Sequence, residues 1–393
     1  MKINSGPEAI EEVLTKGVET IYPSFEALKK RMMSGKKMKL YCGYDPSSPS
    51  LHIGHLATLR KLADFQALGH EVIMLIGDFT GTIGDPTGKL QARKKLTRKE
   101  VIKNAKNYKD KAAKIIDFTG TNPAKLLYNS KWLDKLSFND LIELASNFTV
   151  QQMIIRDMFQ QRIKQNKPVF LHEFLYPLAQ AYDSVAMDVD LEVGGNDQTF
   201  NMLAGRELMR ILKGKEKFVL TARLLTDAQG KKMGKTEGNA LNVNDSPKDM
   251  RGKIMKLPDE VIDQVFDSCT KINSKTLKSL LPRDKKEKLA DEIVKTFYGE
   301  TEAEKTKKEF NKVFREKELP SEMTSVKISE HALGLLDLLV TLKLASSKSD
   351  AKRLVIQKGV KIDGKVEDDW KKTIDIKKGM VIQIGRRRFA KII

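Results

Sequence analysis

The stretch that decides the fold is residues 37–79, which read KMKLYCGYDPSSPSLHIGHLATLRKLADFQALGHEVIMLIGDF. Its first part, 37–45, is short and apolar and ends in a Pro/Ser-rich turn, as a strand that enters a loop does. Residues 52–70 place their apolar side chains along one helical stripe. Residues 71–79 are an almost unbroken apolar run, which is typical of a strand in a parallel sheet covered on both faces. Strand, helix and strand in this order predict a right-handed βαβ unit and a doubly wound α/β fold.

The rest of the chain continues this mixture and then changes. Apolar residues at helical spacing predict helices over 8–33, with a break at Pro23, over 97–116 and 137–165, and throughout the region that follows residue 246. Further strands are expected within 183–198, which ends in glycines, and at 218–225. The segment ELPSEMTS, 318–325, has the composition of a linker. Beyond it we expect two helical stretches and then short strands.

The composition is that of a folded globular protein, with 40% apolar, 31% charged and 7% aromatic residues. A chain of 393 residues predicts two to four domains, because one domain usually takes roughly 100–200 residues. Lysine and arginine outnumber aspartate and glutamate by 71 to 52. This excess favours a polyanionic partner, nucleic acid or an acidic membrane surface, over a basic but unspecialised surface. The excess is pronounced in 331–393, where there are 15 Lys/Arg and 7 Asp/Glu, a net charge of +8.

Cysteine use and hydropathy point to the cytoplasm. Cys42 and Cys269 are too few and too far apart in the sequence for a disulfide framework or a CxxC metal site. No stretch approaches the roughly 18 consecutive apolar residues of a membrane span, so no membrane association is expected. The N-terminal segment has no apolar signal core, and its acidic residues disfavour a transit peptide.

Two motifs suggest phosphate chemistry. In SLHIGH, 50–55, two histidines lie three residues apart at a strand-to-helix junction, where a helix N-terminus attracts anions. Gly54 has no Cβ, so a ligand is able to approach the backbone there. A metal pair is the rival interpretation of the histidines, although no further ligands lie nearby. In AQGKKMGKT, 228–236, two lysines and a threonine on a glycine-punctuated loop suit a triphosphate, and a solvated basic turn is the alternative.

Together these motifs resemble the HIGH and KMSKS signatures of class I aminoacyl-tRNA synthetases. Further segments are similar to tyrosyl-tRNA synthetases of the bacterial type: YCGYDPSSPSLHIGHL at 41–56, GTIGDPTGK at 81–89, Tyr176–Gln180–Asp183 in a YxxxQxxD pattern, and GGNDQ at 194–198. The basic C-terminal segment resembles the S4 RNA-binding module of that family. The chain departs from the family pattern at Gly234 and Thr236, which replace serines of KMSKS, and at Thr199, where many members carry an aromatic residue.

The resemblance implies the roles of individual residues. The residues implied in catalysis are His52, His55, Ser47, Lys232, Lys235, Thr236, Lys89 and Arg93. Those implied in tyrosine binding are Tyr41, Asp85, Tyr176, Gln180, Asp183 and Gln198. Those implied in ATP binding are Gly43, Asp45, His52, Gly54, His55, Gly195, Asp197 and Lys235, and those implied in RNA binding are Arg386, Arg387 and Arg388. In the tyrosine pocket, Tyr41 and Asp183 would meet the phenol hydroxyl, because an ionised carboxylate only accepts hydrogen bonds. The α-ammonium would be held by Asp85, Tyr176 and Gln180.

The resemblance also implies an architecture and a set of partners. It divides the chain into a Rossmann-like catalytic domain at 1–228, a KMSKS-type loop at 229–245, a helical anticodon-binding domain at 246–326 and a small α+β S4 domain at 327–393. The implied partners are L-tyrosine, ATP accompanied by Mg²⁺ and tRNA(Tyr), with no metal held by the protein itself. A homodimer is implied as well.

Two other functions stay open at this point. A tryptophanyl-tRNA synthetase has the same fold, although the YxxxQxxD pattern and the S4-like segment disfavour it. An RNA-binding or splicing factor that kept the fold without catalysis is the second alternative, and the complete HIGH and KMGKT motifs disfavour it.

Overall fold

The computed structural model describes residues 2–91, 95–226, 241–316, 318–319, 323–385 and 388–393. By its internal contacts the chain divides into two compact units, Met1–Ala303 and Glu304–Ile393. Among the described residues, no helix is both long enough and apolar enough to cross a membrane.

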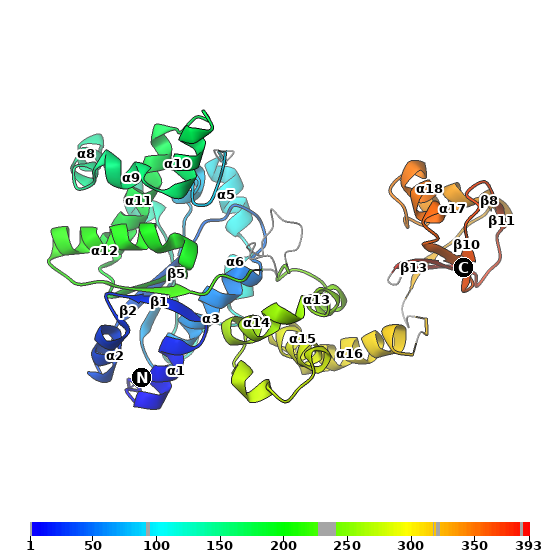
Figure 1. Ribbon diagram of the computed structural model, residues 1–393, viewed down its shortest axis with the longest axis horizontal. Helices are drawn as coiled ribbons and strands as arrows, with labels where there is room; N and C mark the ends of the chain where they lie inside the picture. Colours follow the sequence, from blue (N-terminus) through cyan, green and yellow to red (C-terminus); the bar gives the residue numbers. More distant parts are fainter. Residues whose placement is uncertain (1, 92–94, 227–240, 317, 320–322, 386–387) are drawn as a thin grey trace. The chain divides into compact units, whose positions relative to one another are not determined.

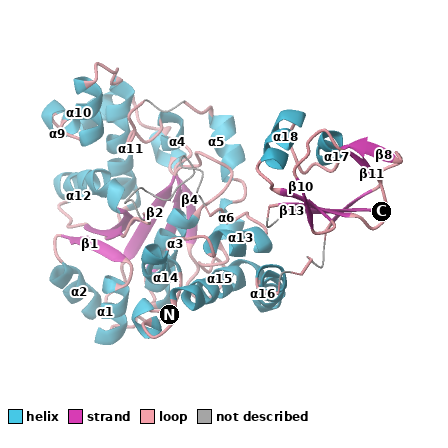
Figure 2. Cartoon of the chain, turned by 45° about the vertical axis from the view of Figure 1, so that its right-hand side comes forward, coloured by secondary structure: helices cyan, strands magenta, loops and turns pink. Residues whose placement is uncertain are grey.

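The first unit is built on a six-stranded sheet, shown in magenta in Figure 2. The strand order is β1-β6-β5-β2-β3-β4, and the strands span Val18–Tyr22, Phe218–Ala222, Leu191–Gly195, Lys39–Tyr44, Glu71–Ile76 and Lys125–Tyr128. All neighbours are parallel except β1, which runs antiparallel to β6 at the edge. The predicted unit of 37–79 is β2, helix α3 (Ile53–Ala67) and β3. The doubly wound α/β fold is therefore confirmed.

Both faces of this sheet are covered, and the strands alternate between two apolar clusters. In β2, Leu40 and Cys42 belong to the large core on the side of α3, whereas Tyr41 packs with Leu75 and Met187. The second face is covered by α11 (Leu171–Met187) and α12 (Thr199–Lys213), which pack closely together in Figure 1. Because both faces of the sheet are covered, the strands of 37–79 carry apolar residues on both faces.

The remaining helices of the first unit flank the sheet or follow it. They are α1 (Pro7–Thr15), α2 (Phe25–Met33), α4 (Thr80–Ile83), α5 (Arg98–Ala105), α6 (Tyr108–Ala112), α7 (Ser130–Leu133), α8 (Phe138–Ala145), α9 (Val150–Ile154), α10 (Asp157–Lys164), α13 (Pro247–Ile254), α14 (Ile262–Cys269), α15 (Pro282–Tyr298) and α16 (Glu300–Phe314), of which α16 crosses the division between the units.

The helix predicted over 8–33 is wrong in its middle, where strand β1 lies. Helix α1 ends before Gly17, whose φ of +66° is a left-handed conformation that glycine adopts readily. The following VETIY is rich in β-branched and aromatic residues, and it pairs with β6, some 200 residues away in the sequence. The spacing of Val18 and Ile21 fits a helix by itself, so only the distant pairing partner decides for a strand.

The helices predicted over 97–116 and 137–165 are each divided into shorter ones. The side chains of Ser137 and Thr149 each accept a hydrogen bond from the backbone N–H three residues further on, and so they start α8 and α9 separately. Thr97 does the same for α5, and α6 begins anew at Tyr108. These side-chain caps are helix start signals inside what the apolar spacing alone suggests is one helix.

The helical region after residue 246 packs directly on the sheet domain. Met250 of α13, Phe266 of α14 and Leu289 of α15 belong to the same apolar cluster as Leu40 of β2 and Leu59 of α3. These helices and the sheet therefore form one continuous core.

The second unit has its own core and its own sheet, of order β10-β9-β12-β13-β7, and a small β11-β8 pair. Its elements are β7 (Thr324–Val326), β8 (Ala332–Gly334), α17 (Leu335–Thr341), α18 (Lys348–Ile356), β9 (Val360–Ile362), β10 (Lys365–Glu367), β11 (Thr373–Asp375), β12 (Val381–Ile384) and β13 (Arg388–Ile392). The two helices followed by short strands agree with the sequence. The linker expected at 318–325 is too long, because β7 begins at Thr324 and pairs in parallel with β13.

Candidate active site

A cavity of about 1060 Å³ opens at the carboxyl ends of the parallel strands. It lies where the strand order reverses, with β3 on one side of β2 and β5 on the other. The pairs Leu40–Leu191 and Tyr41–Glu192 are the register between β2 and β5, although β2 runs on to Tyr44 and β5 to Gly195. The two strands thus part toward their ends, as expected at the ligand site of a doubly wound sheet.

Every predicted tyrosine-binding, ATP-binding or catalytic residue that the structure describes lines this cavity. These residues are Tyr41, Gly43, Asp45, Ser47, His52, Gly54, His55, Asp85, Lys89, Tyr176, Gln180, Asp183, Gly195, Asp197 and Gln198. The predicted residues Arg93, Lys232, Lys235, Thr236, Arg386 and Arg387 lie outside the described residues. Arg388 is exposed at the start of β13, and its guanidinium donates to the carbonyl of Leu344 at 2.8 Å.

The two histidines lie at the N-terminus of α3, and in both rings Nδ1 accepts a hydrogen bond from a backbone N–H. The backbone N–H of His52 donates to Nδ1 of His55 at 3.0 Å, and that of Gly54 donates to Nδ1 of His52 at 3.1 Å. Because both Nδ1 atoms accept, each neutral ring carries its proton on Nε2. The ring centroids lie 3.9 Å apart. The pair is thus arranged to donate two hydrogen bonds to an anion.

The sequence suggested that Gly54 lets a ligand approach the backbone, but in the structure the space beside it holds the ring of His52. A Cβ at this position would lie 3.0 Å from Cε1 of His52. The missing side chain therefore makes room for the imidazole. At Gly43, by contrast, a Cβ would meet no atom of the described residues within 4 Å, so a ligand in the cavity is able to approach the backbone there.

Asp183 of α11 lines the cavity and is buried. Its two carboxylate oxygens accept from Nε1 of Trp132 at 2.7 Å and from Nδ2 of Asn129 at 3.2 Å. The amide of Asn129 is itself fixed, because its oxygen accepts from the backbone N–H of Phe79 at 2.9 Å. Burial raises the pKa of Asp183 well above the ordinary carboxyl value, and the two donors oppose that shift.

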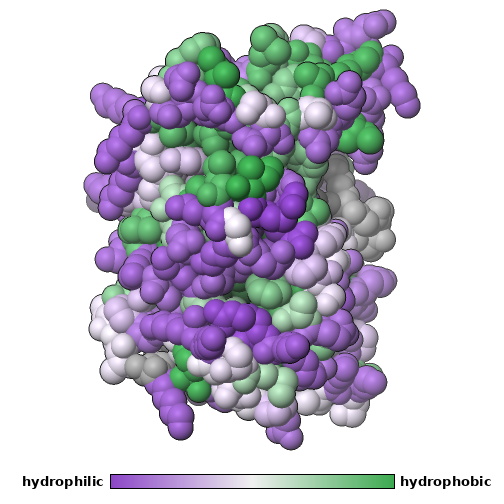
Figure 3. Space-filling view, turned by 90° about the vertical axis from the view of Figure 1, so that its left-hand side faces the viewer, coloured by the Kyte–Doolittle hydropathy of each residue, from purple (hydrophilic) through white to green (hydrophobic). Residues whose placement is uncertain are grey.

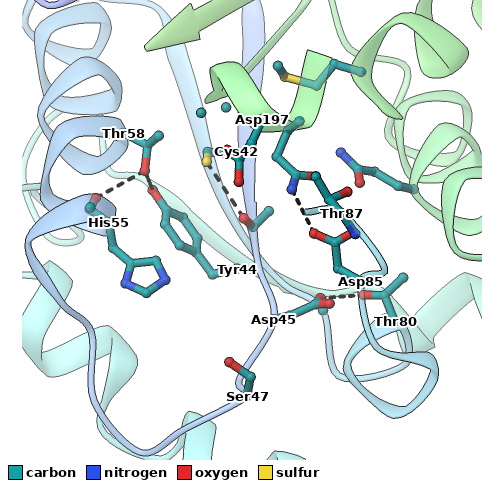
Figure 4. Close-up of a pocket in the computed structure, with 18 of the residues that line it drawn as sticks. Cys42, Tyr44, Asp45, Ser47, His55, Thr58, Thr80, Asp85, Thr87 and Asp197 are labelled. Atoms are coloured by element: carbon teal, nitrogen blue, oxygen red, sulfur yellow. Dashed lines mark hydrogen bonds between the residues drawn. The ribbon is translucent and has the colours of Figure 1, made fainter. Parts of the chain in front are cut away.

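Asp45 lies between the predicted nucleotide and amino-acid groups. The hydroxyl of Tyr176 donates to one carboxylate oxygen at 2.9 Å, and that of Thr80 donates to the other at 2.7 Å, as drawn for Thr80 in Figure 4. Gly77 makes this arrangement possible, since a Cβ there would lie 1.9 Å from Oδ1 of Asp45. The predicted ammonium ligand Tyr176 and the predicted nucleotide ligand Asp45 are thus direct partners.

Asp85 and Gln198 are also paired across the cavity. Nε2 of Gln198 donates to Asp85 at 2.7 Å, and the backbone N–H of Thr87 donates to the other carboxylate oxygen at 2.9 Å. Figure 4 shows Asp85 and Thr87 on the side of the pocket opposite His55. The oxygen of Gln198 accepts from Asn201 at 2.9 Å, so the orientation of its amide is fixed.

Sequence reasoning missed a layer of buried or half-buried residues whose polar atoms support these groups. Asn129, Trp132, Ser184, Glu192 and Lys217 all contact a predicted site residue or one of its partners. Tyr41, predicted to meet a substrate hydroxyl, bonds to the hydroxyl of Ser184 at 3.0 Å. Ser184 and Glu192 lie within 183–198, the segment expected to hold a strand, but nothing in the sequence marked Asn129, Trp132 or Lys217.

The arrangement suits one large ligand that has an anionic end and an end with hydrogen-bond donors. Carboxylates and a buried amide stand at one end, and imidazole donors at a helix N-terminus stand at the other. Among the described residues, no three His, Cys, Asp or Glu side chains are placed to share a metal ion.

Comparison with protein families gives two matches. The family of tRNA synthetases class I (W and Y) matches residues 33–315. The C-terminal domain family of tyrosine–tRNA ligases of the SYY-like kind matches residues 315–391. Together they account for the chain from the end of α2 to β13.

Individual relatives cover nearly the whole chain. The tyrosine–tRNA ligase of Thermotoga maritima is 43% identical, over 98% of this chain and 98% of its own. That of Moorella thermoacetica is 41% identical, over 97% of this chain and 94% of its own. The solved tyrosyl-tRNA synthetase of Archaeoglobus fulgidus, complexed with L-tyrosine, has the same fold, with a TM-score of 0.59 and 23% identity over 76% of this chain and 99% of that one.

Proposed function

The chain belongs to the class I tRNA synthetases, among the tyrosine–tRNA ligases, and we propose that its cavity joins tyrosine to ATP and charges tRNA(Tyr). The observation that carries the proposal is the cavity itself. It brings together residues from positions 41 to 198 that were assigned separately to tyrosine and to ATP.

Tyrosine would lie with its phenol ring toward Asp183. The carboxylate of Asp183 is held by Trp132 and Asn129 and would accept the phenolic proton, with Tyr41 beside it. The α-ammonium would lie near Asp85 and Gln180. Tyr176 would act partly through Asp45, since its hydroxyl donates to that carboxylate.

ATP would occupy the end with the histidines. The Nε2–H groups of His52 and His55 would donate to phosphate oxygens, and Gly43 would let the nucleotide approach β2. Asp197 and Gly195 would meet the ribose. Lys89 lines the cavity and would face the phosphates, together with the loop that carries Lys232, Lys235 and Thr236.

The reaction needs no covalent bond to the protein. A carboxylate oxygen of tyrosine attacks the α-phosphorus of ATP, the bond to the bridging oxygen breaks, and pyrophosphate leaves. A hydroxyl of the terminal ribose of tRNA then attacks the tyrosyl carbonyl, and AMP leaves. The protein contributes positioning and hydrogen-bond donors aimed at the developing negative charge. Mg²⁺ would enter with ATP, held by phosphate oxygens and water rather than by a protein cage.

The C-terminal unit would bind tRNA, with the S4-type module at 327–393 following the helical domain at 246–326. Its excess of basic residues and the segment around Arg388 support phosphate contacts. We place the reaction in the cytoplasm, because both cysteines are free and buried, in accord with a reducing compartment.

A homodimer is supported by an apolar surface on the first unit. Large exposed apolar side chains gather on α8, α9 and the start of α11; Phe138 is 78% and Leu171 82% exposed, and Ile142, Val150 and Ile155 are exposed beside them in sequence. Figure 3 shows green side chains in the upper part of this face, at the height where Figure 1 places α8 and α9. Exposed apolar side chains grouped on neighbouring elements in this way are typical of a subunit interface.

The test is exchange of pyrophosphate into ATP with single amino acids. Tyrosine is expected to support exchange, whereas tryptophan and phenylalanine are not. Exchange with tryptophan would favour the tryptophanyl alternative. Absence of exchange with every amino acid, together with binding of tRNA, would favour a non-catalytic RNA-binding protein.

A further inference from the structure

Lys217 and Glu192 form a buried ion pair directly behind the tyrosine pocket. Lys217 precedes β6 and is completely buried, and Glu192 of β5 is almost so. The ammonium of Lys217 contacts Oε2 of Glu192 and also donates to the hydroxyl of Ser184 at 2.9 Å. Two charges are removed from water at this place, which is costly unless their hydrogen bonds are satisfied.

The second oxygen of Glu192 determines how Gln180 is oriented. Oε1 of Glu192 accepts from Nε2 of Gln180 at 3.0 Å. Since a carboxylate does not donate, this contact requires the NH₂ group of Gln180 to face Glu192 and the amide oxygen to face elsewhere. That oxygen is buried and has no hydrogen-bond partner among the described residues, while Gln180 and Glu192 both line the cavity. A donor bound in the cavity would satisfy it.

Gly205 of α12 keeps the place of the lysine open. A Cβ at this position would lie 2.6 Å from Nζ of Lys217 and 2.9 Å from Oγ of Ser184. The ion pair therefore depends on three separate parts of the chain: Glu192 in β5 and Lys217 before β6 form it, and Gly205 in α12 leaves the space for it. Glycine inside a helix is destabilising relative to alanine, so its presence at this position is explained by this contact.

We propose that the Lys217–Glu192 pair is a positioning device that sets Gln180 to accept a hydrogen bond from the α-ammonium of tyrosine. The proposal rests on the proposed function, because it assigns the ligand of that same cavity. Lys217 does not touch the substrate. It holds Glu192 in its orientation through the ion pair, and Glu192 in turn directs the amide of Gln180.

The test compares two ligands that differ in the ammonium. L-tyrosine and 3-(4-hydroxyphenyl)propanoate share the phenol and the carboxylate, and the second lacks the amino group. Any effect transmitted through Ser184 to Tyr41 acts on the phenol end and cancels in the ratio of the two affinities. In the full-length protein, the tyrosine KM and the inhibition constant of the analogue are both measured in pyrophosphate exchange, along with the KM of ATP.

Lys217→Met is expected to raise the tyrosine KM about tenfold, because one charge-assisted hydrogen bond is lost. The inhibition constant of the analogue and the KM of ATP are expected to stay unchanged. The double variant Glu192→Gln/Lys217→Met removes both charges but keeps an amide oxygen to accept from Gln180. It is expected to restore the tyrosine preference to within about threefold. Gly205→Ala, which displaces the lysine from a neighbouring helix, should reduce the preference in the same direction.

Lys61→Met is the matched control, because Lys61 is also a fully buried lysine, paired with Asp64 at 3.0 Å and distant in the sequence from Gln180. This substitution should lower the stability of the protein but leave the ratio of the affinities for tyrosine and the analogue unchanged. An unchanged ratio in Lys217→Met would overturn the proposal, as would a double variant as impaired as the single one. If Lys217→Met does not fold, the double variant and Gly205→Ala still decide the question. Failure of the wild-type protein to exchange with tyrosine would contradict the proposed function instead.

Discussion

Asp183 shows how a single carboxyl group is prepared for recognition. Burial raises its pKa, whereas the N–H groups of Trp132 and Asn129 stabilise the ionised form. An acceptor for a phenol hydroxyl has to be charged or strongly polar, yet it has to stand in an apolar place to exclude water. The two fixed donors supply hydrogen bonds that water would otherwise give, so they stabilise a carboxylate in a buried place.

Trp132→Phe is therefore expected to weaken tyrosine binding about tenfold, since one hydrogen bond to a buried charged group is lost. Phenylalanine, which makes no use of that charge, should be affected less, so the tyrosine-to-phenylalanine ratio of kcat/KM falls. Trp370→Phe in the second unit is the same substitution away from the cavity and should leave the ratio alone. Equal loss for both amino acids would mean that Trp132 only shapes the pocket.

At the scale of elements, the junction between α3 and β3 contains a buried histidine. His70 accepts from the backbone N–H of Met38 at 3.3 Å through Nδ1, and its carbonyl accepts from Asn122 at 2.8 Å. It thereby links the end of α3 to the start of β2. Burial lowers the pKa of His70 from 6.5 to about 4, because a charged imidazolium has too few partners there.

This lowered pKa predicts a loss of stability in acid. Between pH 6.5 and 4 the unfolded chain binds a proton at His70 that the folded protein does not, so the free energy of unfolding falls as the pH falls. The contribution is about 2–3 kcal/mol between pH 7.5 and 4.5. His70→Asn keeps an acceptor for Met38 but does not titrate, and urea unfolding should show a smaller loss over this range. His331→Asn, at an exposed position, should follow the wild-type pH dependence; a His70→Asn curve that also follows it would contradict the prediction.

At the scale of the whole molecule, the two units have separate cores. Among the described residues, the core of the second unit is drawn from 326–392, and that of the first ends at Ala303. The strand β7 belongs to the C-terminal sheet, so a truncation that begins at 327 would leave a sheet strand behind. A cleaner division removes residues 318–393.

Deleting 318–393 should leave tyrosine-dependent pyrophosphate exchange within about threefold of full length and reduce tRNA charging by at least tenfold. The reason is that the cavity draws its described lining from residues 41 to 225, while the removed segment is itself basic, with 16 Lys/Arg against 10 Asp/Glu. Both activities are measured over a salt series, in which the full-length protein should show the steeper dependence of tRNA binding. Equal loss of exchange and charging would show that the catalytic unit depends on the removed one.

The sequence by itself determined the central βαβ unit and the parallel sheet. These follow from local patterns: apolar runs, a helix that begins at two histidines, and polar residues placed where strands end. Strands whose carboxyl ends share one sheet edge bring such residues together without further information. The family resemblance supplied the set of side chains that meet in the cavity and their separate roles.

The tertiary structure alone decided β1 and the polar layer behind the pocket. VETIY is compatible with a helix until β6 is available as a pairing partner, because strand formation depends on contacts far away in the sequence. Lys217 and Trp132 look like ordinary residues in the sequence, and their importance comes from which buried group each one contacts. Burial, and with it the cost of an unpaired charge, is a property of the assembled fold, and no local pattern contains it.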